Sequence, residues 1–257
     1  MKRIIALLLA VLMLFAVASC GNNAAKTDVE AVKAAGKLVV GMTVYEPMNY
    51  KDANGEWTGF DTEFAQAVAK ELGAEAEFVV IDWDNKWATL ESKKIDVVWN
   101  GMTLTEEAKT NADCTDTYIV NAQVVVMKAD KTANYTTVDS MKDLKFAVEA
   151  GSAGETIGKD NGLTTVAYTA QSDAMTAVKS DKADACIIDI TMAKAMTGEG
   201  TDFADLGIGI SLSEEEYAIA CRKGSDLPAK INELMKNMKA DGSLQALATK
   251  YNVTLTD

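Results

Sequence analysis

Residues 92–100 read Ser-Lys-Lys-Ile-Asp-Val-Val-Trp-Asn, and residues 180–189 read Ser-Asp-Lys-Ala-Asp-Ala-Cys-Ile-Ile-Asp. Each stretch has a polar turn, then an apolar run of strand length, then a polar residue where the strand should end. In open α/β sheets, ligands bind just beyond the carboxyl ends of the strands. The two stretches therefore predict that Asn100 and Asp189 face one cleft from two similar halves of the chain. Chance similarity between two helix–turn–strand units is the alternative.

Strand-like and helix-like segments alternate along the chain from Lys37 onward. Short apolar runs indicate strands, and apolar residues at helical spacing indicate helices. The alternation predicts mostly parallel sheet covered by helices, and its two halves predict two lobes. The expected strands cover residues 38–41, 78–81, 95–99, 123–128, 146–149, 165–168, 185–188 and 217–221. The expected helices cover residues 62–72, 85–92, 154–159, 172–180, 191–196, 227–240 and 243–251, with Asp61 capping the first and Ser243 the last.

The N-terminus has the composition of a secretory signal. Lys2 and Arg3 precede an apolar run over residues 4–17, and small residues follow. A membrane-spanning helix needs about 20 apolar residues, and this run is shorter. A cleaved signal peptide over residues 1–19 is therefore favoured over an uncleaved anchor helix.

The stretch Val17-Ala18-Ser19-Cys20 resembles the lipobox of bacterial lipoproteins. The resemblance implies that Cys20 carries a lipid and becomes the first residue of the mature chain. Polar residues follow, and we expect residues 20–36 to hold the lipidated cysteine and a flexible tether. Such a protein lies on the outer face of the cytoplasmic membrane, attached through its lipid alone.

The mature chain is strongly acidic and contains no histidine. Without residues 1–19 it has 23 basic and 38 acidic residues, a net charge of −15. This charge argues against nucleic-acid binding, which needs a cationic face. No phosphate loop, nucleophile motif or metal-ligand cluster is present, and Cys114, Cys186 and Cys221 lack CxxC spacing. We expect these cysteines to be structural, and we expect no enzymatic activity, no metal and no cofactor.

Several motifs resemble those of polar amino acid ABC-transporter binding proteins, which have the type 2 periplasmic-binding-protein fold. They occur in the same order as in that family: Gly36-Lys-Leu-Val-Val-Gly41, Gly59-Phe60-Asp61, Lys94-Ile95-Asp96 and Gly101-Met-Thr-Leu-Thr105. The resemblance covers essentially the whole mature chain. It implies a two-lobed clamshell of two mixed, mostly parallel sheets flanked by helices and joined by two hinge strands.

The resemblance also implies the boundaries of the lobes. Residues 37–120 together with 217–257 would form the first lobe, and residues 121–216 the second, with hinge strands near Val120 and Glu216. Ligand would bind between the lobes and stabilise their closed arrangement, which a permease recognises.

The family's ligand-binding positions transfer to this sequence one at a time. Gly101 and Thr103 match groups that hold the two ends of an amino acid, and Asp189 matches the acid that pairs with its ammonium. Asp189 could instead cap the following helix. The candidate ligand-binding residues are Tyr45, Trp83, Asn100, Gly101, Thr103, Lys109, Gly151, Ser152, Ala153 and Asp189. Ordinary helix capping is the alternative for the loop 151–153, and core packing is the alternative for the two aromatic residues.

The sequence departs from this family where an arginine would bind the ligand's carboxylate. Ala108 stands at that position, and Arg222, the single arginine of the mature chain, lies in another segment. Either Lys109 or another donor substitutes as a point charge, or the ligand has no free α-carboxylate in the usual place. Acidic residues near the predicted cleft favour a cationic or neutral ligand, and we place Glu46, Asp82 and Asp84 at its mouth.

The sequence thus predicts an extracytoplasmic, monomeric solute-binding lipoprotein. It would take up a small polar ligand, an amino acid or a similar solute, and deliver it to an ABC transporter permease. Two alternatives remain: a sensory or structural lipoprotein on the same scaffold, and a receptor for an amine or a peptide-like ligand.

Overall fold

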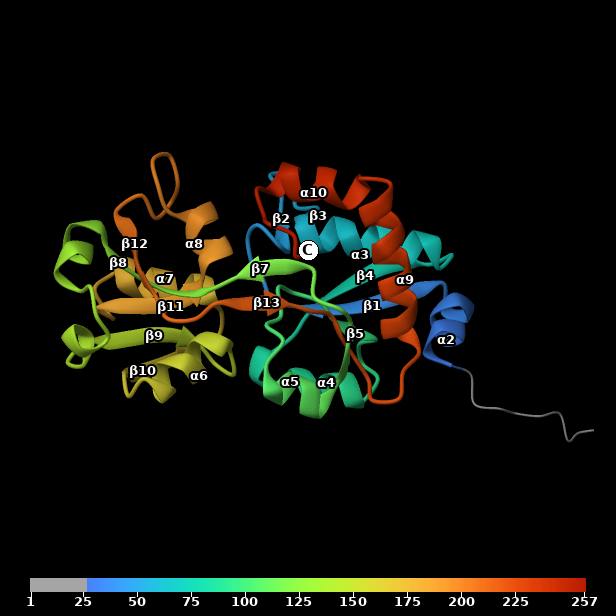
Figure 1. Ribbon diagram of the computed structural model, residues 1–257, viewed down its shortest axis with the longest axis horizontal. Helices are drawn as coiled ribbons and strands as arrows, with labels where there is room; N and C mark the ends of the chain where they lie inside the picture. Colours follow the sequence, from blue (N-terminus) through green and yellow to red (C-terminus); the bar gives the residue numbers. More distant parts are fainter. Residues whose placement is uncertain (1–26) are drawn as a thin grey trace, which may run out of the picture.

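The computed structural model describes residues 27–257 (Figure 1). The predicted signal peptide, the lipidated Cys20 and residues 21–26 of the predicted tether lie outside the described residues. Within residues 27–257, no helix combines the length and the apolar character that crossing a membrane requires.

The predicted tether over residues 20–36 is wrong at its C-terminal end, because residues 28–35 form a helix, α2 (Asp28–Ala35). Thr27 and Glu30 form a capping box at its start, and Gly36 ends it in the left-handed conformation. Val32 is buried, and the amide of Val29 donates to Asp226 at 3.0 Å. The Thr-x-x-Glu pattern was the sequence signal for this helix.

Two five-stranded sheets form the two lobes, which lie side by side along the long axis (Figure 1). The first sheet has the order β4-β1-β5-β14-β6, with β1 parallel to β4 and β5, and β14 antiparallel to β5 and β6. Its strands are β1 (Lys37–Met42), β4 (Glu75–Val80), β5 (Val97–Val98), β6 (Asp113–Cys114) and β14 (Ala220–Cys221).

The second sheet has the order β10-β9-β11-β8-β12, in which β9 is parallel to both neighbours and β8 is antiparallel to both of its own. Its strands are β8 (Gln123–Lys128), β9 (Lys145–Glu149), β10 (Thr164–Tyr168), β11 (Ala185–Asp189) and β12 (Leu206–Ser211). Both sheets are mixed, as the sequence predicts.

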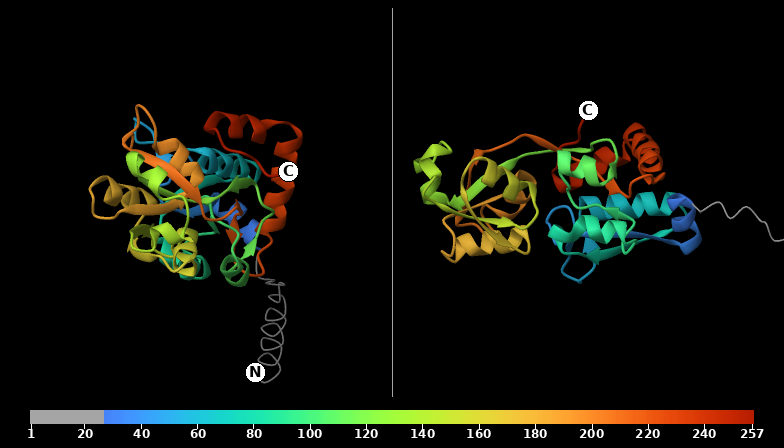
Figure 2. Two further views of the ribbon diagram at one scale, coloured as in Figure 1. Left: turned by 60° about the vertical axis from the view of Figure 1, so that its left-hand side comes forward. Right: turned by 90° about the horizontal axis from the view of Figure 1, so that it is seen from below.

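Two short strands cross between the sheets. They are β7 (Ile119–Asn121) and β13 (Glu215–Tyr217), which pair antiparallel with Val120 opposite Glu216 (Figure 1). The single strand predicted over residues 217–221 is therefore two strands, β13 and β14, that belong to different sheets. After the second crossing the chain adds α9 (Leu227–Ala240) and α10 (Ser243–Tyr251) to the first lobe, where both contact α3 (Phe60–Glu71) (Figure 2).

Shorter elements surround the sheets. In the first lobe they are β2 (Tyr50–Lys51), β3 (Trp57–Thr58), η1 (Trp83–Asn85), α4 (Lys86–Glu91) and α5 (Glu106–Asn111). In the second lobe they are η2 (Ala129–Asn134), η3 (Asp139–Met141), α6 (Ala153–Asp160), α7 (Gln171–Lys179) and α8 (Ile190–Met196).

Two predicted helix caps are wrong. Ser243 is the first residue of α10, and Gly242, in the left-handed conformation, is the capping residue before it. Asp61 lies inside the first turn of α3, and Gly59 precedes the helix with φ at 121°. A Cβ at Gly59 would come within 2.2 Å of the Met48 carbonyl oxygen, so only glycine fits there.

Asp61 is instead a buried carboxylate in the aromatic core of the first lobe. It accepts hydrogen bonds from the Gly101 amide at 2.6 Å and the Tyr118 hydroxyl at 2.8 Å. Burial raises the pKa of Asp61 to about 7, although these donors oppose the shift. The carboxylate fixes the loop after β5, which lines the cavity described below.

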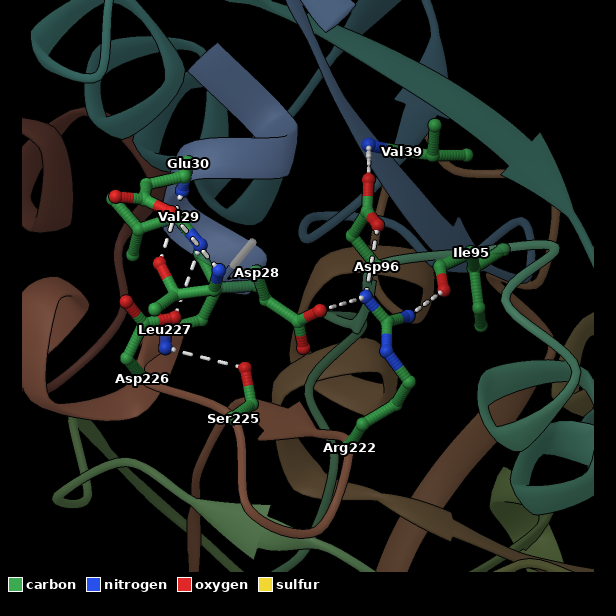
Figure 3. Close-up of polar contacts among 11 residues, drawn as sticks. Asp28, Val29, Glu30, Val39, Ile95, Asp96, Arg222, Ser225, Asp226 and Leu227 are labelled. Atoms are coloured by element: carbon green, nitrogen blue, oxygen red, sulfur yellow. Dashed lines mark hydrogen bonds and ion pairs between the residues drawn. The ribbon is translucent and has the colours of Figure 1, made fainter. Parts of the chain in front are cut away.

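A single arginine joins three segments of the first lobe. The Arg222 guanidinium pairs with Asp28 of α2 and Asp96 before β5, each at 3.1 Å, and donates to the Ile95 carbonyl at 2.6 Å (Figure 3). Its side chain is only 11% exposed. Arg222, which the sequence places outside the predicted ligand-binding segment, therefore holds α2 and the residues before β5 together.

We expect Arg222→Leu to lower the free energy of unfolding by about 2–4 kcal/mol, because it leaves two half-buried carboxylates without their ion-pair partner. Lys37→Met is the control, since its pair with Glu77 is exposed and should be worth less than about 1 kcal/mol. Urea denaturation of both variants measures the difference. Equal losses in the two variants would show that the Arg222 pairs act like ordinary surface pairs.

Candidate functional site

A cavity of about 340 Å³ lies between the lobes. Segments of both lobes enclose it, and both lobes contribute strand ends. The residues that line it are Trp83, Lys86, Trp87, Asn100, Gly101, Met102, Thr103, Thr105, Glu106, Glu107, Gln123, Glu149, Gly151, Ser152, Ala153, Thr156, Asp160, Gln171 and Asp189. A cavity of this size suits a small molecule.

The structure brings eight of the ten candidate residues to this cavity. Only Tyr45 and Lys109 do not line it. Tyr45 is 2% exposed, and its hydroxyl bonds to Thr191 and Tyr217. Tyr45 therefore lies behind the cavity wall, which is the core position that the sequence analysis weighed as the alternative.

Lys109 does not line the cavity. Its side chain is 51% exposed and pairs with Glu106, three residues earlier on α5, at 2.7 Å. Ala108 is 1% exposed and packs in an apolar cluster with Trp83, Leu90 and Met102. Neither Ala108 nor Lys109 lines the cavity in this arrangement.

Polar side chains of the first-lobe loop after β5 form hydrogen bonds with other residues of the protein. The Asn100 side chain bonds to Thr43 and Asn49. The Thr103 hydroxyl donates to Glu215 at 2.8 Å. Gly101 has φ at 52°, and a Cβ there would come within 2.6 Å of the Tyr45 ring. The loop is thus held rigidly from behind, with glycine required where it bends.

The second-lobe loop 151–153 begins α6. The Ser152 hydroxyl accepts from the Glu155 amide at 3.1 Å, and the Gly151 amide donates to the Glu155 carboxylate at 2.9 Å. These bonds are ordinary capping, which was the alternative for this loop. A Cβ at Gly151 would come within 2.8 Å of Asp84 in the first lobe, so the two lobes are in close contact here.

Asp189 occupies the N-cap position of α8, yet its side chain makes no capping bond. Its carboxylate accepts from Asn121, Gln123, Gln171 and Tyr217. Burial and the nearby charge of Glu215 raise the pKa of Asp189, while its hydrogen-bond donors lower it. The helix-capping alternative for this residue is therefore wrong, and the carboxylate is the centre of a buried network.

Glu149 is an acidic cavity residue that the sequence analysis missed. It ends β9, is 2% exposed, and its Oε1 atom has no hydrogen-bond partner among residues 27–257. Burial, together with the charge of Asp189, raises the pKa of Glu149 to about 8. Its place at the carboxyl end of a strand is the same signal that identified Asp189. An unpartnered buried oxygen in a cavity wall is a site for a donor from a ligand.

Lys86 is the other missed residue. It is 5% exposed, and its Nζ donates to the Gly151 carbonyl at 2.8 Å and the Trp83 carbonyl at 3.2 Å. The rings of Trp83 and Trp87 each lie 5.1 Å from Nζ. Burial lowers the pKa of Lys86, and the charges of Glu107, Glu149 and Asp84 oppose this shift. No local sequence pattern indicates that a lysine at the start of α4 is buried.

The cavity wall is acidic. Lys86 is the only basic side chain that lines it within residues 27–257, against five acidic ones: Glu106, Glu107, Glu149, Asp160 and Asp189. The acids expected at its mouth lie elsewhere. Glu46 lines a separate hollow, and neither Asp82 nor Asp84 lines the cavity, although Asp84 lies against Gly151.

Comparisons with known proteins agree with this geometry. The chain is 34% identical to the arginine-binding extracellular protein ArtP of Bacillus subtilis over 98% of each chain. It is 32% identical to the L-cystine-binding protein TcyJ of Escherichia coli, over 86% of this chain and 84% of that protein. The ancestral amino acid-binding protein AncCDT-1, a precursor of cyclohexadienyl dehydratase, superposes with a TM-score of 0.79 at 31% identity, over 87% of this chain and 98% of that one.

The relatives named here are binding proteins, and the family resemblance drawn from the motifs is confirmed. The model of one family matches residues 38–254, nearly the whole described chain. The protein belongs to the bacterial extracellular solute-binding proteins, family 3.

Proposed function

We propose that the protein captures a cationic amino acid in the cavity between its lobes and delivers it to an ABC transporter permease. The observation that carries the proposal is Glu149, a buried carboxylate in an acidic cavity wall with an oxygen that has no partner among residues 27–257. A buried carboxylate is costly unless a cation or a donor meets it, so a ligand cation would relieve that cost. The arginine-binding relative supports the same ligand class.

An amino acid also carries an ammonium and a carboxylate, and the cavity offers groups for both. Asp189 is the proposed partner of the ammonium. The loop residues Gly101 and Thr103 and the start of α6 at residues 151–153 are the proposed partners of the remaining polar atoms. Trp83 and Trp87 supply apolar surface for the ligand's aliphatic part.

The remaining features of the proposed function follow from the sequence. We propose cleavage after residue 19, a lipid at Cys20, and a monomer held at the outer face of the membrane. Residues 37–120 with 217–257, and residues 121–216, would be the two bodies that move about the crossing strands β7 and β13. Ligand that contacts both bodies would stabilise the closed form for recognition by the permease.

Isothermal titration of the purified protein tests the ligand class. We expect binding of L-arginine and L-lysine, weaker binding of L-glutamine, and no binding of L-glutamate. Glu149→Gln should weaken L-arginine binding at least about tenfold, because the neutral amide cannot compensate the guanidinium charge. Glu91→Gln, on the exposed face of α4, is the control and should bind as the wild type does. Undiminished affinity in Glu149→Gln would exclude Glu149 as the cation's partner.

The raised pKa of Glu149 also predicts how pH affects the protein without ligand. Its pKa of about 8 in the folded state exceeds the ordinary value of 4.5, so the folded state holds a proton that the unfolded state releases. The stability that this proton provides is complete below pH 4.5 and is lost as the pH rises through 8. The slope is at most about 1.4 kcal/mol per pH unit for this one group.

Denaturation of the wild type and Glu149→Gln from pH 5 to pH 8.5 measures this contribution. We expect the wild type to lose stability relative to the variant as the pH rises. Affinity for L-arginine should rise over the same range, because the cation binds the ionised carboxylate. A constant difference between the two proteins at every pH would mean that Glu149 titrates as an exposed glutamate does.

A further inference from the structure

We propose that Lys86 pairs with the ligand's carboxylate, replacing the arginine that is absent at position 108, and that the same ammonium links the two lobes when they close. This proposal rests on the proposed function, because it concerns how the same cavity holds an amino acid. Lys86 lies outside the segment of Ala108 and Lys109, where the sequence predicts the positive charge of the site.

The positions of the other basic residues exclude them as partners of the ligand's carboxylate. A carboxylate that enters a desolvated cavity needs a positive partner or several donors. Ala108 packs among apolar side chains, Lys109 is exposed and paired with Glu106, and Arg222 is engaged by Asp28 and Asp96. Lys86 alone among the basic residues of the described chain lines the cavity.

The Lys86 ammonium has a hydrogen-bond donor that residues 27–257 do not use. An ammonium has three hydrogens to donate, and Lys86 makes two hydrogen bonds within residues 27–257, to the carbonyls of Trp83 and Gly151. One donor therefore remains for a ligand. The Trp83 and Trp87 rings, each 5.1 Å from Nζ, stabilise its charge. Lys86 is thus a fixed cation with unused capacity.

Lys86 lies where the two lobes meet. Lys86 begins α4 in the first lobe, and Gly151 precedes α6 in the second. Its bond to the Gly151 carbonyl therefore joins the two lobes, beside the loop 151–153 that is a proposed partner of the ligand. A carboxylate between Lys86 and this loop contacts both lobes, and such a contact favours the closed form by its own binding energy.

Removal of the carboxylate from the ligand gives a test specific to this role. Agmatine is arginine without its carboxylate, so a residue that pairs with the carboxylate affects arginine but not agmatine. We expect Lys86→Met to weaken L-arginine binding at least about thirtyfold, as measured by isothermal titration, and agmatine binding less than about threefold. Lys86→Arg should retain the preference of the wild type for arginine over agmatine.

The control is Lys37→Met, which removes the same charge from an exposed pair on β1 whose residues do not line the cavity, and it should change neither affinity. Methionine keeps an apolar, unbranched side chain at this position, and Lys86→Gln repeats the comparison if Lys86→Met does not fold. Equal losses for arginine and agmatine would overturn the carboxylate assignment and leave Lys86 as a closing contact alone. No loss for either ligand would overturn both parts of the proposal.

The wild type distinguishes failure of this proposal from failure of the proposed function. Binding of arginine and agmatine with equal affinity would overturn the carboxylate pairing while preserving cation binding. Absence of binding to L-arginine, L-lysine and the other amino acids would overturn the proposed function, and the Lys86 assignment with it.

Discussion

The buried carboxylate of Asp189 is the interaction on which the arrangement of the lobes depends. Asn121 and Tyr217, which donate to it, belong to the two strands that cross between the lobes. Its other donors, Gln123 and Gln171, belong to the second lobe. One carboxylate therefore ties both crossing strands to the end of β11, and the same strand end forms part of the cavity wall.

This network also limits how the cavity can bind a charged ligand. The two oxygens of a carboxylate have about four lone-pair positions, and four protein donors already point at Asp189. Asn121 and Gln123 share their amide hydrogens with Glu215, at 2.6 and 2.8 Å. A ligand ammonium at Asp189 must then compete with protein donors, whereas a cation at Glu149 meets a free oxygen. Glu149 is for this reason the stronger determinant of the charge of the ligand.

The sequence predicted the fold well because fold depends on patterns that repeat along the chain. Apolar runs and helical spacing located most strands and helices, and the strand ends at Asn100 and Asp189 indicated the two walls of one cavity. The errors concern contacts between distant segments. Asp61 stands where a helix cap is expected, but it is buried in the core, where it accepts hydrogen bonds from the Gly101 amide and the Tyr118 hydroxyl.

Lys86 shows why a binding site is harder to predict than a fold. A lysine at the start of a short helix is usually exposed, and only the closeness of Gly151, 65 residues later, makes it part of a cavity. Ala108 and Trp83 pack in one apolar cluster, and the Trp83 ring lies 5.1 Å from the Lys86 ammonium. In the proposed site the positive charge therefore lies on α4 instead of α5. Because Lys86 also bonds the opposite lobe, the charge that receives the ligand becomes part of the contact that closes the protein around it.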